Sequence, residues 1–117
     1  MRDAVNLDRA GEPRLERATS TANSAATITV AADEEQFWAI DWITASYNAG
    51  SPDGTLTVAY GGTTVWEVDI KGEETKHFPF DARPLYDDDS TPKDKALTIT
   101  LSAGGTSVIG KVNARIR

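Results

Sequence analysis

A chain of 117 residues, 39% of them hydrophobic, is long enough for one domain with a buried core and too short for two. A formal charge of −6 argues against nucleic acid as the main partner, because phosphate binding requires a basic surface. The lack of cysteine excludes disulfides and zinc–thiolate sites, and no apolar run reaches the roughly 18 residues of a membrane span.

The N-terminal part of the chain differs in composition from the rest. Residues 3–10 have the composition of a short helix that a following glycine and proline would end, and the fragment 14–18 is too short to be stable alone. Residues 19–26 are small and polar, as in a linker. We therefore predict an extended N-terminal arm over residues 1–25, ordered against a partner, ahead of a β-sandwich domain over 26–117. The alternative is a loose terminus without a role.

The longest candidate strand lies at 36–47, after a short strand at 27–32. Apolar residues fall on both faces of this long strand. The pattern predicts either a central strand covered on both sides or a bulge that switches the faces midway. Because a lone buried carboxylate is costly, we expect Asp41 to be exposed or hydrogen-bonded at such a bulge.

Residues 55–65 and 96–108 share one pattern: threonines alternate with apolar residues, and a Gly-Gly pair follows. Alternation is typical of a half-buried strand, and the glycines supply the positive φ of a tight turn. We therefore predict two β-hairpins of similar build, each with a threonine-rich outer face. The side chains expected to point inward are Leu56, Val58, Tyr60, Leu97, Ile99 and Leu101.

The remaining strands follow the same rules. The first hairpin returns with Trp66, Val68 and Ile70 inward, and the second returns with Lys111, Asn113 and Arg115 outward. Pro79 cannot donate to a ladder, so the strand at 75–80 either lies at an edge or stops there. With about seven or eight short strands and frequent turn signals, the chain is predicted to be all-β, an antiparallel β-sandwich of jelly-roll-like form.

Catalytic chemistry has little support in the sequence. The one histidine, His77, has no evident triad partner, and a surface or hydrogen-bonding histidine is the better interpretation. Asp87, Asp88 and Asp89 could hold calcium, but they lack the alternating spacing of a calcium loop, so a solvated acidic loop is favoured. We therefore expect no enzymatic activity, no cofactor and no bound metal.

The aromatic residues allow two interpretations. A sugar-stacking platform would require the rings to share one exposed face, whereas large aromatic side chains are usually buried. Core packing is favoured, because Trp66 is in phase with Val68, and Trp38 and Trp42 are in phase with Ile40. The aromatic residues considered are Trp38, Trp42, Tyr60 and Trp66.

The order of these segments resembles that of small β-sandwich proteins encoded in the structural-gene regions of tailed bacteriophages, several of which are capsid decoration (cement) proteins. The resemblance covers roughly residues 27–116 and rests on the sequence pattern of the predicted strands and turns, not on a catalytic motif. The segments that carry it are Phe37–Tyr47, Gly54–Val58, Gly61–Ile70, Phe78–Phe80, and Leu97–Leu101 with Gly104 and Gly105.

The resemblance implies a structural virion protein that binds the major capsid protein on the outer surface of a phage head and bridges neighbouring capsomers. It also implies self-association, often as a homotrimer, and no partner among nucleic acids or membranes. The N-terminal arm would reach across the shell, its arginines pairing with acidic capsid surface and its leucines filling small pockets. The arm residues with these roles are Arg2, Leu7, Arg9, Arg14, Leu15 and Arg17.

Two other classes remain open. A carbohydrate- or receptor-binding module of a phage tail would show tryptophan fluorescence that responds to glycans. A small cupin-like enzyme would require a metal site, for which a single histidine is too few.

Overall fold

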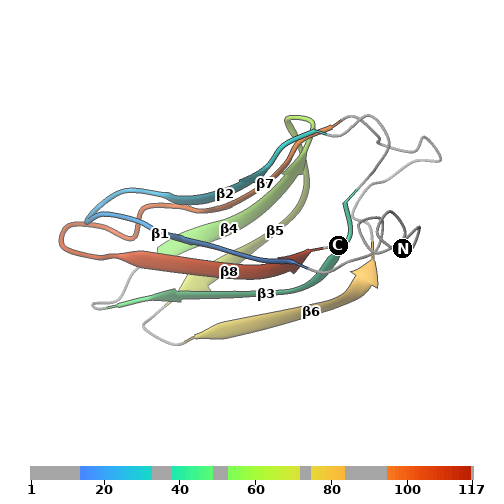
Figure 1. Ribbon diagram of the computed structural model, residues 1–117. Helices are drawn as coiled ribbons and strands as arrows, with labels where there is room; N and C mark the ends of the chain where they lie inside the picture. The colour runs from blue at the N-terminus through green and yellow to red at the C-terminus, as the bar shows by residue number, and fades with distance from the viewer. Residues whose placement is uncertain (1–13, 33–37, 49–52, 72–74, 84–94, 117) are drawn as a thin grey trace, which may run out of the picture.

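The computed structural model describes residues 14–32, 38–48, 53–71, 75–83 and 95–116, which form eight β-strands and no helix (Figure 1). All statements about the structure concern these residues. The strands are β1 (Arg14–Thr19), β2 (Ala26–Val30), β3 (Ile40–Tyr47), β4 (Asp53–Tyr60), β5 (Thr63–Lys71), β6 (Lys76–Arg83), β7 (Leu97–Leu101) and β8 (Gly110–Ile116).

The strands form two four-stranded sheets, in which every neighbouring pair is antiparallel. Sheet A has the order β1-β8-β3-β6, and sheet B has the order β2-β7-β4-β5. Within them, β4 pairs with β5, β3 with β6, β2 with β7 and β1 with β8, as if one long hairpin had been folded over twice. This is the connectivity of a jelly roll. The predicted fold class is therefore confirmed.

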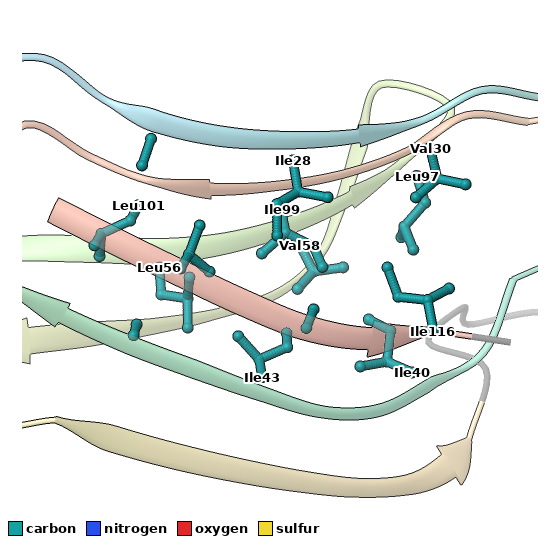
Figure 2. Close-up of a cluster of buried hydrophobic side chains, with 14 of the residues drawn as sticks. Ile28, Val30, Ile40, Ile43, Leu56, Val58, Leu97, Ile99, Leu101 and Ile116 are labelled. Atoms are coloured by element: carbon teal, nitrogen blue, oxygen red, sulfur yellow. The ribbon is translucent and has the colours of Figure 1, made fainter. Parts of the chain in front are cut away.

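The core lies between the two sheets (Figure 2). It consists mainly of the alternate residues of the strands whose side chains face the opposite sheet. The inward phases predicted for β2, β4, β7 and β8 are confirmed, since those residues are buried and the threonines between them face outward. The largest fully buried side chains are Ile40, Ile43, Leu56, Val58, Ile70, Leu97, Ile99, Leu101, Val112 and Ile116.

A bulge in β3 switches the faces of this strand, as one of the two predictions required. The register shifts between Ile40 and Trp42 in the pairing with both β6 and β8. Ile40 is buried before the shift, and Ile43 is buried after it. Asp41 lies at the bulge with its side chain 13% exposed, and its Oδ2 is 3.3 Å from Nε of Arg115. Asp41 was expected to be exposed or hydrogen-bonded at a bulge, and the structure places it at the bulge in an ion pair with Arg115.

The second predicted hairpin is wrong. The β4–β5 turn has φ of +62° at Gly61 and +88° at Gly62, as a tight turn requires. By contrast, β7 belongs to sheet B and β8 to sheet A, so residues 102–109 cross between the sheets. Only the second glycine of that pair, Gly105, has a positive φ, and a Cβ on Gly104 would lie 2.8 Å from the Tyr47 ring. The two Gly-Gly pairs therefore have different roles. Gly61 and Gly62 form a tight turn, whereas Gly104 allows close packing against Tyr47.

The predicted boundary between arm and domain is also wrong. Residues 14–19 form β1, which pairs with β8 from Arg14↔Ile116 to Thr19↔Lys111. The supposed linker is a turn fixed to the sandwich, because the Ser20 amide donates to the Gly110 carbonyl at 2.9 Å. The sandwich thus begins at β1. The charged segment Arg14–Thr19 has no strand pattern in its sequence, and its strand conformation depends on the pairing with β8.

Candidate interaction surface

The described residues contain no cluster typical of metal binding. No group of three or more histidine, aspartate or glutamate residues among them could hold a metal ion. His77 is exposed, and its Nδ1 shares a 3.0 Å hydrogen bond with the hydroxyl of Thr44. The prediction of a surface, hydrogen-bonded histidine is thus confirmed. The same residues contain no helix long and apolar enough to cross a membrane.

The outer face of sheet A is the most distinctive surface of the described part. Strand register aligns outward side chains from all four strands into rows, because residues directly opposite each other share a face. One row is Leu15, Arg115, Trp42 and Pro79, and the next is Arg17, Asn113, Thr44 and His77.

This face combines apolar and cationic groups. Leu15 is 51% exposed, and among the described residues it is the only large hydrophobic side chain that is so open. Arg17, Lys111 and Arg115 supply positive charge, and Asp41 at the bulge pairs with Arg115. A chain with a net charge of −6 therefore presents one sheet face on which cations predominate. Such a mixture of apolar and basic groups suits an acidic protein surface.

Trp42 corrects the prediction that it packs in the core. It was expected to share the face of Ile40, but the extra residue of the bulge turns it to the opposite side. There it is half-buried, with its ring centroid 5.7 Å from that of His77 and the two planes inclined at 41°. The pair forms a small aromatic centre within the outer face of sheet A.

The other three aromatic residues considered above, Trp38, Tyr60 and Trp66, lie in the core or pack against it, as predicted. Trp38 is buried, and its backbone amide donates to the hydroxyl of Tyr60, which is also buried. Trp66 packs edge-on against Phe78 and Phe80 of β6, with ring centroids 5.3 and 5.0 Å away. A platform of several exposed tryptophans is therefore not formed by these residues.

The structure separates the predicted partner-binding residues that it describes. Leu15 and Arg17 lie together on the outer face of sheet A. Arg14 points to the other side of β1, where its guanidinium lies 4.9 Å from the Trp38 ring centroid and its Nη1 is 3.8 Å from Oε2 of Glu16. The other predicted residues, Arg2, Leu7, Arg9 and the acidic Asp87, Asp88 and Asp89, lie outside the described residues.

Sequence reasoning missed the central members of this surface. Lys111 and Arg115 were predicted to face outward, but nothing in the alternation indicated which strands would lie beside theirs. Trp42 was missed because the position of a one-residue bulge is not evident from hydrophobicity alone. The polar Thr44 and Ser46, which follow it in the same phase, were the signal that could have placed it outside.

Similarity of this chain to known proteins is found among solved structures and not at the level of sequence families. No protein-family model and no curated protein matches the chain. Among solved structures it is similar to a carbohydrate-binding module, CBM36, in complex with calcium and xylotriose, at 13% identity and a TM-score of 0.44, over 85% of this chain and 76% of that one. It is also similar to a Bacillus endospore appendage protein of disulfide-linked pili, at 14% identity and a TM-score of 0.42, over 92% and 90%.

A de novo designed double-stranded β-helix is similar as well, at 13% identity and a TM-score of 0.43, over 87% of this chain and 97% of that one. At such identities the functions of these proteins do not carry over to this chain. Its own strand pairing defines a small antiparallel β-sandwich of jelly-roll topology.

Proposed function

We propose that this protein is a structural virion protein, a capsid decoration protein that binds the outer surface of a tailed-phage head and bridges neighbouring capsomers. The observation that supports the proposal is the outer face of sheet A, where β1 sets Leu15 in line with Arg115 and Trp42 and sets Arg17 in the next row. Exposed apolar groups beside arginine and tryptophan are typical of the centre of protein interfaces. The resemblance of the sequence segments, in their order along the chain, to those of phage decoration proteins suggests the class of partner.

The pairing of β1 with β8 changes how the N-terminal segment would act. Leu15 and Arg17 are held in a ladder before any partner arrives, so their ordering cost has been met during folding. Only the residues before β1, including Arg2, Leu7 and Arg9, would then add contacts that form on binding. Docking would combine a rigid face with this additional segment, at the virion surface and in an oligomer.

The experiment uses purified phage heads that lack the protein. Added protein should co-sediment with the heads at a fixed ratio to the major capsid protein. Trp42→Thr should weaken binding about 30-fold, the equivalent of a hot-spot cost of about 2 kcal/mol. Arg17→Glu should also weaken it, and more so at low salt, because it opposes an acidic partner.

The matched control is Thr57→Ala, on the outer face of sheet B, which should leave binding unchanged. Circular dichroism of each variant checks that the sandwich is intact. Full-affinity binding by Trp42→Thr and Arg17→Glu together would show that a different surface docks. Absence of binding by the wild-type protein would refute the proposed function itself.

One observation favours a second candidate, a carbohydrate-binding module of a phage tail. The half-buried Trp42 ring beside His77, flanked by Asn113 and Thr44, offers a stacking surface with polar groups around it. Trp38 is buried and Trp66 packs against the core, so a glycan would change only the emission of Trp42. A glycan-dependent fluorescence change that Trp42→Phe abolishes would support this candidate over the first.

A further inference from the structure

The four edges of the two sheets are not equally protected against pairing with another strand. The edges are β1 and β6 in sheet A and β2 and β5 in sheet B. Unpaired backbone groups at an edge invite a further strand, and proteins discourage this with charges, prolines and bulges. β6 contains Pro79, which has no amide hydrogen to donate. β1 carries Arg14, Glu16 and Arg17 within six residues.

The edge strand β5 is protected in two ways. Its register with β4 shifts between Val58 and Ala59, which leaves Val65 as an extra residue in the strand. It also presents the exposed charges of Glu67 and Asp69. A bulge twists an edge and interrupts its ladder, so an added strand would find no continuous row of partners there.

The edge strand β2 has none of these features. Ala26–Val30 contains no charge and no proline, and its register with β7 is unbroken over five pairs. Thr27 and Thr29 are exposed, and Ile28 between them is buried. In the described part of the chain, its only hydrogen-bonded neighbour is β7. It is therefore a regular edge, rich in β-branched residues, that is ready for strand addition.

We propose that β2 pairs antiparallel with β2 of a second copy of this chain, around a two-fold axis at Ile28, so that two sheets B become one continuous sheet. Two features of this edge favour a second copy. Because Ala26–Val30 carries no charge, two copies of a chain with a net charge of −6 can pair there without setting like charges opposite each other. The two-fold axis also sets Thr27 opposite Thr29 of the other copy, a favourable cross-strand pair.

This inference does not depend on the proposed function. Edge pairing extends sheet B within its own plane, whereas the proposed docking surface is the outer face of sheet A, the other layer of the sandwich (Figure 1). The interface formed by pairing two five-residue strands buries less surface than a standard protein interface. We therefore expect a reversible dimer with a dissociation constant of roughly micromolar magnitude.

The test is sedimentation velocity of the full chain over about 1 to 200 μM, a range that brackets the expected dissociation constant. The wild-type protein should pass from monomer to dimer as its concentration rises. The double variant Thr27→Lys/Thr29→Lys sets like charges opposite each other across the axis and should weaken the dimer about tenfold. The double variant Thr27→Glu/Thr29→Lys sets unlike charges opposite each other and should restore it.

The matched control is Thr63→Lys/Thr64→Lys, which adds the same charge to exposed positions of β5 at the far edge of sheet B. It should dimerise like the wild type, and thermal unfolding checks that every variant folds. A wild-type protein that stays monomeric would overturn the inference. So would a trimer, or an equal loss in the like-charge and unlike-charge variants. Binding to phage heads is measured separately, so the two proposals can fail independently.

Discussion

Substitution of Gly54 by alanine is expected to destabilise the sandwich through one identifiable contact. Gly54 lies in β4, and a Cβ built on it would fall 1.8 Å from the Tyr47 Oη and 3.0 Å from the Ser102 Oγ. The Tyr47 hydroxyl donates to the Ser102 carbonyl at 2.8 Å, and the Ser102 hydroxyl accepts from the Thr55 amide at 2.8 Å. The added methyl group therefore displaces a buried tyrosine from a position that fixes the start of the crossover between the sheets.

The expected cost has two parts. Forcing a methyl group into a packed site costs about 1 to 3 kcal/mol. Loss of the Tyr47 hydrogen bond adds about 1 kcal/mol. We therefore expect Gly54→Ala to lower the free energy of unfolding by about 2 to 4 kcal/mol, a large share of the stability of a small domain.

Urea unfolding of a double-mutant cycle measures this effect. Tyr47→Phe removes the hydroxyl that the new Cβ meets first, so Gly54→Ala should cost less in that background by at least about 0.5 kcal/mol. Gly62→Ala is the control, since nothing lies within 4 Å of the added Cβ. Because the φ of Gly62 is +88°, the loss of stability in this variant would come from backbone strain. Its cost of about 1 kcal/mol should not depend on Tyr47. Additive costs for Gly54→Ala and Tyr47→Phe would refute the reasoning.

Three further predictions concern the same core and the outer face of sheet A. Burial raises the pKa of the Tyr47 phenol above its usual 10.0, so the unfolded chain ionises first and stability falls as the pH rises above about 10. In urea unfolding, Tyr47→Phe should make this alkaline loss smaller. Trp66→Leu should lower the free energy of unfolding by about 2 kcal/mol, because it removes two edge-on aromatic contacts at the side of the sandwich. The loss should appear as a lower midpoint of thermal unfolding. Arg115→Gln should cost less than about 1 kcal/mol, with a salt-dependent part, since its ion pair with Asp41 is nearly half exposed on the arginine side.

Much of the fold could be predicted because alternation is a local property. Ile28, Leu56 and Ile99 each lie between two threonines, and a strand with that pattern has only one way to bury its apolar side. The pairing of strands is not local. Nothing in residues 96–108 distinguishes a hairpin from a crossover until Tyr47, from a distant strand, is seen to occupy the space beside Gly104.

The candidate surface could be predicted only in fragments for the same reason. Outward positions on β8 followed from alternation, but their alignment with Leu15 and Arg17 depends on β1, whose charged sequence was interpreted as part of an arm. Tertiary pairing overrode a weak local preference there. A surface built from four strands is a property of sheet order, which a single sequence does not encode in any one segment.

The position of Trp42 separates what the fold requires from what it leaves free. The bulge at Asp41 is needed to bury Ile43, Ala45 and Tyr47, and the side chain at position 42, directly after the bulge, must then face outward. Folding therefore explains why the side chain at position 42 faces outward, but it does not explain why a tryptophan stands there. We expect Trp42→Thr, which keeps a good strand former, to change the free energy of unfolding in urea by less than about 1 kcal/mol. A larger loss would assign the ring to folding and remove it from the proposed docking surface. A small one, with binding lost, would leave recognition as the reason for its presence.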